Sequence, residues 1–361
     1  MTRDALSGAP PRITVGQPVR CAVQPFETTP PAIQELLTKP IRELGLKLEG
    51  SPLEKFVREL YREIERKGLR HFRPACYLTD EWGCPSGEPV VGIPFYLADP
   101  KLAALEREMN DLEDEREIMM YLRHEAGHAF NYAYELYRTD EWRRLFGPFR
   151  RAYREHYRPV PFSRRYVRHI AGWYAQKHPD EDFAETFAVW LTPRSAWRSR
   201  YRGWGAMRKL RYVDREARRV ADQPPLRAIG DKDITVEEMD ITIEQFYQAH
   251  APDETHALAD LALDPDLTDI LLKPSPRRRA GIRPAAPWLA EHRKQIVDKV
   301  TYWTGVRRPL VRALVASIEH RVEALGLAVE TDREPAQLVE MTAYATTLAM
   351  NYLTRGRFIQ P

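Results

Sequence analysis

Two histidines lie four residues apart in the segment YLRHEAGHAFNYAY, residues 121–134, and a glutamate follows the first of them. On a helix, residues four apart lie on one face a turn apart, so His124 and His128 can bind one metal ion through their imidazole rings. Glu125 would then face the open side of the metal, where it could act as a general base. This HExxH pattern predicts a zinc site. The alternative is a solvated helix face whose histidines bind no metal.

A catalytic zinc ion needs a third protein ligand as well as an open position for water. The extended motif with a third histidine is excluded, because Asn131 and Tyr134 stand where its glycine and histidine would fall. Residues 174–188, YAQKHPDEDFAETFA, predict a helix that carries two glutamates four apart, Glu181 and Glu185. One of them would bind zinc, and the other would accept the second ring N–H of a ligand histidine.

Together, the two segments resemble the gluzincin metallopeptidases, and especially the bacterial proteins described as zinc-binding metallopeptidases. The active-site pattern is also similar to those of anthrax lethal factor and of clostridial Pro-Pro endopeptidase. The resemblance covers roughly residues 70–215 and includes GIPFYLADP, which is similar to the edge strand over the site in such folds. It implies a zincin-like domain in which Glu181 binds the metal, Glu185 supports a ligand histidine, and Tyr174, seven residues before Glu181, assists catalysis.

These residues predict zinc-dependent hydrolysis of peptide bonds, with Glu125 taking the proton of a zinc-activated water and passing it to the leaving amine. Tyr174 would donate a hydrogen bond to the oxyanion, unless its ring only packs beside Trp173. An extended peptide substrate could pair with the strand VVGIPFYL, residues 90–97. Two other interpretations stay open. The chain could be a zinc-bearing binding protein that has lost turnover, or an interaction module with a structural zinc ion.

Other candidate residues are less specific. His169 and His178 flank the second motif, but single histidines in such places are more typical of surface or capping positions than of metal ligands. The run PRRRAGIR, residues 276–283, lacks interleaved aromatic residues and resembles an interdomain linker, so we expect no nucleic-acid partner.

Basic and acidic residues are segregated. Residues 141–220 carry 20 Lys or Arg against 8 Asp or Glu, whereas residues 221–270 carry 2 against 13. The two segments could neutralise each other across the fold, or the basic one could attract an acidic peptide substrate. The arginines that bracket the second motif are Arg164, Arg165, Arg168, Arg194, Arg198, Arg200 and Arg202.

Composition suggests where the protein works. Its first 20 residues contain no apolar segment like that of a signal peptide, and no stretch approaches the 18 or so apolar residues of a membrane span. We therefore expect no membrane partner and a cytoplasmic location. The three cysteines, Cys21, Cys76 and Cys84, are an odd number without zinc-knuckle spacing, which predicts reduced thiols.

The elements that must position these groups predict an α+β fold that is mainly helical. We expect strands within residues 72–78 and 89–97, with Pro94 at a sheet edge, and one long helix over residues 111–137. A chain of 361 residues can hold a catalytic domain and an accessory unit. The predicted parts are a flexible lead-in (1–30), a zincin-like domain (31–272), a Pro/Arg-rich linker (273–288) and a helical C-terminal module (289–361).

Overall fold

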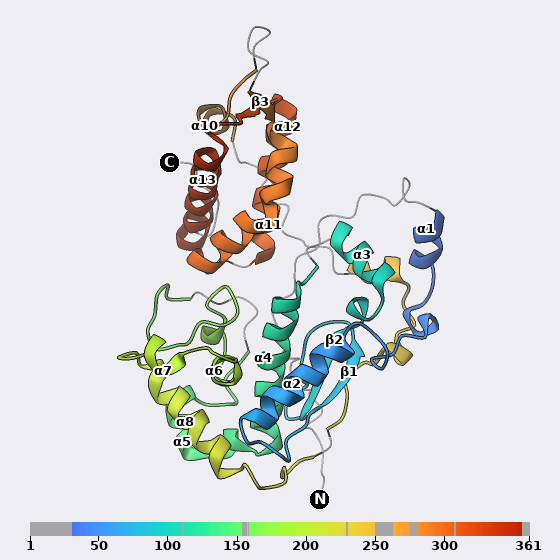
Figure 1. Cartoon of the computed structure of the whole chain (residues 1–361), viewed down its shortest axis with the longest axis vertical. Helices are drawn as coiled ribbons and strands as arrows, with labels where there is room; N and C mark the ends of the chain where they lie inside the picture. The colour runs from blue at the N-terminus through green and yellow to red at the C-terminus, as the bar shows by residue number, and fades with distance from the viewer. Residues whose placement is uncertain are drawn as a thin grey trace, which may run out of the picture.

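The computed structural model describes residues 31–109, 112–153, 157, 159–228, 230–249, 263–274, 281–306 and 308–355. The predicted lead-in at residues 1–30 and residues 275–280 of the predicted linker lie outside the described residues. The described chain is mainly helical and contains two small sheets of two strands each (Figure 1). This architecture confirms the predicted α+β, mainly helical fold class.

Helix α4 (Glu115–Ala133) carries the HExxH motif. The Asp114 side chain accepts from the backbone N–H of Glu117, whose side chain bonds back to Asp114, so a capping box begins the helix. Acidic residues in this first turn also interact favourably with the positive end of the helix dipole. The helix is shorter than the predicted span of residues 111–137. The chain turns at Glu135, which has a left-handed φ of 49°, and a separate 3-10 turn, Leu136–Arg138, follows.

Helix α6 (Pro179–Leu191) carries the second motif and is buried along its whole length. His178 caps its N-terminus by accepting from the Asp180 backbone N–H, and Pro179 occupies the first turn, where no intrahelical donor is needed. Helices α4 and α6 pack closely at Gly127. A β-carbon on Gly127 would lie 2.8 Å from the Cα of Ala184, so only glycine permits this approach.

Strands β1 (Ala75–Thr79) and β2 (Val90–Pro94) form a parallel pair beside α4. Pro94 is the last residue of β2, and a 3-10 turn over Phe95–Ala98 follows. The observed strand is therefore shorter than the one predicted within residues 89–97. The segment between β1 and β2 passes along the edge of β2 that faces away from β1. There Gly83 and Gly92 exchange two backbone hydrogen bonds, of 3.3 and 2.7 Å, in an antiparallel bridge.

The other helices described before residue 250 are α1 Pro31–Leu37, α2 Glu54–Arg66, α3 Pro100–Met109, α5 Asp140–Phe146, α7 Trp197–Arg200, α8 Ala206–Arg219 and α9 Ile243–Ala249. Of these, α2 packs on α4, and α5 and α8 pack on α6, whereas α1 and α3 lie to one side of them (Figure 1). Short 3-10 turns occur at Ile41–Leu44, Tyr174–Gln176 (η5) and Val236–Glu238.

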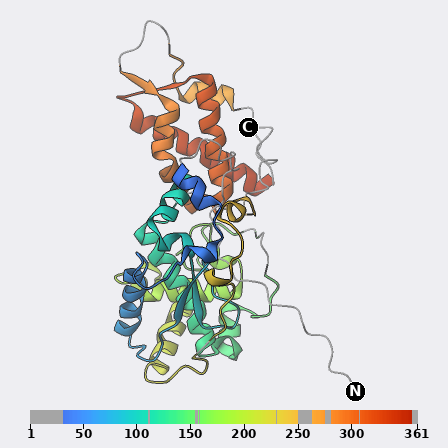
Figure 2. The ribbon, with the colours of Figure 1, turned by 90° about the vertical axis from the view of Figure 1, so that its right-hand side faces the viewer.

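Four helices gather at one end of the molecule in both views (Figures 1 and 2). They are α10 (Asp264–Ile270), α11 (Ala285–Thr304), α12 (Arg308–Leu325) and α13 (Glu334–Arg355). Strands β3 (Ile282–Pro284) and β4 (Ala328–Glu330) pair antiparallel beside them. Within the described residues, the predicted C-terminal module is thus mainly helical, with β4 and short turns between its helices. That strand forms where Gly326, with a left-handed φ of 61°, lets the chain leave α12.

Buried apolar side chains form two separate clusters. The first runs from Leu37 to Tyr247, and the second runs from Leu263 through the C-terminal helices. Leu267 and Leu271, which we predicted to lie in the catalytic domain, pack in the second cluster. The division into domains stays a prediction, and the clusters favour a boundary before Leu263. No helix among the described residues is long and apolar enough to cross a membrane.

Candidate metal centre

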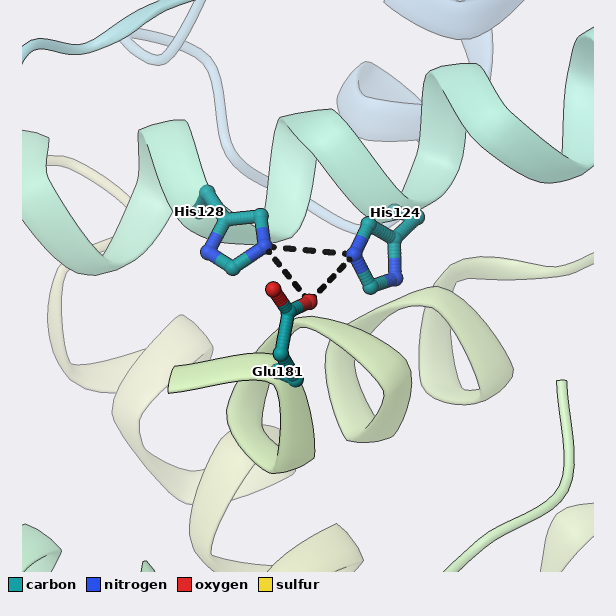
Figure 3. Close-up of side chains that lie close together, drawn as sticks. All are labelled: His124, His128 and Glu181. Carbon is teal, nitrogen blue, oxygen red and sulfur yellow. Dashed lines mark hydrogen bonds and ion pairs between the residues drawn. The ribbon is translucent and has the colours of Figure 1, made fainter. Parts of the chain in front are cut away.

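His124, His128 and Glu181 meet between α4 and α6 (Figure 3). The Nε2 atoms of the two histidines are 3.1 Å apart, and Glu181 Oε2 lies 3.0 Å from His124 Nε2 and 3.2 Å from His128 Nε2. None of the three side chains has exposed surface. The structure therefore brings together the three residues that we predicted as metal ligands.

This donor set fits a zinc ion. A tetrahedral ion with bonds of about 2.0–2.1 Å separates its ligand atoms by about 3.3 Å. The three separations measured here are 3.0, 3.1 and 3.2 Å, close to that value. Two imidazoles and one carboxylate also match the ligand types of catalytic zinc sites that keep one position open. Among the described residues, His124, His128 and Glu181 are the group that could hold a metal ion.

Each histidine has its own carboxylate partner on α6. His124 Nδ1 lies 3.0 Å from Glu185 Oε1, and His128 Nδ1 lies 2.8 Å from Asp180 Oδ2. A carboxylate at Nδ1 keeps the proton there and leaves the Nε2 lone pair for a metal. Glu185 thus lies where we predicted a supporting carboxylate, and Asp180 is a second one that the sequence analysis missed.

Asp180 and Glu185 are themselves fixed by hydrogen bonds. Asn131 Nδ2 donates to Asp180 Oδ1 at 2.7 Å, and the Tyr132 hydroxyl donates to Asp180 Oδ2. Glu185 Oε2 accepts the backbone N–H groups of His169 and Ile170, at 3.2 and 3.0 Å. The orientation of both ligand histidines is therefore tied to α4 itself and to the chain before η5.

The buried carboxylates favour protonated histidines, and the histidines in turn favour an ionised Glu181, so a metal ion would have to displace a proton from the histidines as it binds. Burial alone would lower the pKa of His124, but the hydrogen bonds to Glu181 and Glu185 outweigh it and raise the pKa to about 9. Burial would raise the pKa of Glu181, yet the two histidines hold that pKa far below its usual value. Glu181 is thus an ionised carboxylate, as a metal ligand must be.

Glu125 lies beside the three candidate ligands and is fully buried. Neither carboxylate oxygen of Glu125 has a hydrogen-bond partner among the described residues. Burial raises the pKa of Glu125 to about 7, although the neighbouring histidines lower it. A buried carboxyl group without partners is costly, and its pKa near neutrality suits a group that accepts and returns a proton.

Tyr174 lies at the site as predicted. Its hydroxyl donates to Glu181 Oε1 at 3.3 Å, and its ring packs edge-on against the His124 ring with the centroids 5.6 Å apart. Tyr153, which we did not predict, lies beside it. The Tyr153 hydroxyl is 2.9 Å from Glu181 Oε1 and 3.2 Å from the Tyr174 hydroxyl. Glu181 therefore presents Oε2 to the histidines and Oε1 to two tyrosines.

His169 and His178 lie outside the group of three. His178 caps α6 through Nδ1, and its Nε2 contacts the Arg151 carbonyl at 2.9 Å. His169 Nε2 contacts the Met120 carbonyl at 2.9 Å. His178 therefore has the expected capping role, whereas His169 contacts the backbone of α4, which we did not predict.

The basic segment is neutralised in part by acids within it. Asp214 of α8 pairs with Arg198 and Arg218, each at 2.9 Å. Of the acids after residue 220, Asp222 pairs with Arg70 and Asp240 with Arg42, both outside the basic segment. The side chains of Arg164, Arg165, Arg200 and Arg202 are exposed.

Comparison with known proteins agrees with this chemistry. A family model described as "Putative zinc-binding metallo-peptidase" matches residues 90–215, which include both motifs. No curated protein and no solved structure matches the chain.

Proposed function

We propose that this chain is a zinc-dependent peptidase in which His124, His128 and Glu181 hold the metal and Glu125 is the general base. The observation that carries the proposal is the buried, unpartnered Glu125 carboxylate beside three donors spaced for one ion. The match of residues 90–215 to the metallopeptidase family model supports the same reaction class. A structural zinc site would need no such base.

The chemistry of the bound metal would be to polarise the scissile carbonyl and to make water a better nucleophile near neutral pH. Glu125, with its pKa near 7, accepts a proton from the attacking water and returns it to the leaving amine. Tyr174 donates a hydrogen bond to the developing oxyanion, and its buried hydroxyl beside Glu181 supports this role. Asp180 and Glu185 keep the ligand histidines in the metal-binding tautomer.

Cleavage of a peptide library tests this proposal. Wild-type protein should release defined fragments, whereas Glu125→Gln should keep its metal and lose about 10²–10⁴-fold in kcat, because it removes a base and not a ligand. Tyr174→Phe should lower kcat with little change in KM. Equal cleavage by wild type and Glu125→Gln would reject the mechanism.

One observation favours a second candidate, a zinc-bearing protein that binds partners without turnover. The three ligands and Glu125 have no exposed surface, so a substrate can reach them only after some segment moves. The same library decides between the two candidates. Retention of zinc without cleavage of any peptide would favour the binding protein.

The edge of β2 limits how a peptide could bind. The N–H of Gly92 already donates to Gly83 and that of Val90 to Glu88, and Pro94 has no N–H. Strand addition along this edge of β2 would therefore require the segment around Gly83 to move aside.

The proposal also includes a preference for acidic peptide substrates. Arg164 and Arg165 are exposed, and Asp222 and Asp240 pair with arginines outside the basic segment. If exposed arginines attract the substrate, kcat/KM for an acidic peptide should fall steeply with ionic strength, and less so in Arg164→Gln/Arg165→Gln. Arg58→Gln, an exposed arginine on α2, is the matched control. Equal kcat/KM for matched acidic and neutral peptides at low salt would reject the preference for acidic substrates.

We also propose that the protein works in the cytoplasm. Cys76 and Cys84 are free thiols, which suits a reducing compartment.

A further inference from the structure

The backbone before the candidate catalytic tyrosine is unusual. Gly172 has a φ of 82°, and Trp173 has φ 57° and ψ 38°, so two consecutive residues are left-handed. Tyr174, the first residue of η5, follows directly. A tryptophan rarely adopts this conformation unless its surroundings hold it there. The position of Tyr174 therefore depends on whatever contacts Trp173.

Trp173 is buried against the end of helix α11. Gly305 caps that helix with a left-handed φ of 76°. A β-carbon on Gly305 would lie 2.6 Å from Trp173 Nε1 and nearer still to Cδ1 of the same ring. On its other sides, the Trp173 ring meets the Arg168 guanidinium, 4.2 Å from the ring centroid, and the Phe162 ring at 5.4 Å. The backbone of the C-terminal helices thus forms one wall of the Trp173 site.

The same helix also contacts α4, the helix that carries the two ligand histidines. Lys294 of α11 bonds Glu117 Oε2 at 2.8 Å, in the first turn of the helix that carries both histidines. In Figure 1, α11 lies beyond the N-terminal end of α4. One helix of the C-terminal part therefore contacts both the helix of the histidine ligands and the turn of the tyrosine.

We propose that the C-terminal helices complete the active site, with Gly305 and Trp173 as positioning residues for Tyr174. This inference rests on the proposed peptidase function. Close packing of Gly305 on the Trp173 ring holds the left-handed turn, and the turn aims the Tyr174 hydroxyl at the space beside Glu181. The C-terminal segment, which we expected to be a separate module, is then part of the catalytic machinery.

The test is the substitution Gly305→Ala, with Gly281→Ala as the matched control. Gly281 has a nearly equal φ of 74°, but a β-carbon there would meet nothing within 4 Å. The two variants share the backbone penalty, and only Gly305→Ala pushes on Trp173. We expect Gly305→Ala to lower kcat for the best-cleaved library peptide about 10- to 100-fold, with KM and zinc affinity unchanged. Gly281→Ala should match wild type.

Two further measurements separate positioning from general damage. In a Tyr174→Phe background, Gly305→Ala should cause no additional loss of kcat, because the hydroxyl that it misplaces is already gone. Backbone amide exchange of residues 172–178 should be faster in Gly305→Ala than in Gly281→Ala, a difference that needs no substrate. Trp173→Leu weakens the same contact from the other side and should also lower kcat, which covers the case in which Gly305→Ala does not fold.

Equal kcat in the two glycine variants would overturn the proposal, as would an undiminished effect of Gly305→Ala in the Tyr174→Phe background. Failure of the proposed function looks different, because wild-type protein itself would then cleave no peptide. In that case equal amide exchange at residues 172–178 in the two glycine variants would still overturn the positioning role.

Discussion

Two groups of helices in this chain differ in how many ionisable side chains they bury. Between α4 and α6 the buried side chains include ionisable groups that contact one another, and α6 alone buries Asp180, Glu181, Asp182 and Glu185. Between α11, α12 and α13 the interior is mostly apolar, with residues such as Ile296, Val300, Leu314 and Ile318, although Arg312 and Glu319 of α12 are also buried. The two regions have similar helices, so secondary structure alone does not explain the contrast.

The difference separates burial that stabilises the fold from burial that holds ionisable groups for metal binding. Apolar side chains gain about 25 cal/mol per Å² when they leave water, whereas buried charges cost free energy unless they are paired. Each α6 acid has a partner. Asp182 bonds Lys209 at 2.5 Å, and the other three contact the histidines of α4. We infer that the α4–α6 interior is maintained for metal binding, while the C-terminal interior is maintained by the hydrophobic effect.

The largest effect on stability should come from the apolar region. Leu314 of α12 is fully buried, so Leu314→Ala should lower the free energy of unfolding by about 2–5 kcal/mol through lost burial and a cavity. Because Leu314 is not near the metal ligands in sequence or in its cluster, zinc affinity of the folded protein should not change. Chemical denaturation and chelator competition measure the two quantities. A loss of zinc affinity would mean that the two interiors are coupled.

A smaller effect, of up to about 3 kcal/mol in the free energy of unfolding, should come from protonation of the buried Glu113 carboxyl. Burial raises its pKa from 4.5 to about 7, and Trp82 and Tyr96 donate hydrogen bonds to its Oε1. The folded state holds the proton more tightly than the unfolded state, so this contribution to stability is fully present below pH 4.5 and is lost as pH rises through 7. Glu113→Gln should make the stability of the protein less dependent on pH between 4.5 and 7. An identical pH profile would show that Glu113 ionises normally.

Metal removal should destabilise the polar interior. Zinc at a free concentration of 100 times its Kd would stabilise the folded state by about 2.7 kcal/mol, and a chelator should remove that amount. The thermal midpoint should fall on chelation and recover when zinc is added back. Glu181→Ala, which lacks a ligand, should not respond to either treatment. A midpoint of wild-type protein that ignores the chelator would contradict the contrast between the two regions.

The smallest effects should come from the carboxylates behind the histidines. Asp180→Ala and Glu185→Ala should each weaken zinc binding by about 10- to 100-fold, since each frees one imidazole from its hydrogen bond. Asp182→Asn is the control, because Asp182 is a buried acid of α6 that bonds Lys209 instead. Chelator competition gives the affinities. Equal affinities in all three variants would assign Asp180 and Glu185 to packing alone.

The sequence predicted what depends on local periodicity. A spacing of four residues on one helix brought His124 and His128 together, and the same spacing put Glu181 and Glu185 on one face of α6. The sequence spacing could not decide which glutamate binds the metal, and the family resemblance favoured Glu181. In the structure Glu181 Oε2 lies near both histidine Nε2 atoms, while Glu185 reaches only His124 Nδ1.

Features that depend on contacts between residues distant in sequence could not be predicted. Asp180 is adjacent to Glu181, and neighbouring residues on a helix do not usually face the same partner. It reaches His128 because α6 crosses α4 closely at Gly127. Tyr153 comes from a segment with no periodic pattern. Strand β4 has only three residues, and it pairs with β3 and with Leu272, which are distant in sequence, so no local pattern predicted it.

Metal content tests the central claim most directly. Elemental analysis of purified protein should find one zinc ion per chain in wild type and in Glu125→Gln, and none in Glu181→Ala, because Glu181 is a ligand and Glu125 is not. Wild-type protein that contains no zinc, and takes up none when zinc is offered after chelation, would contradict the account.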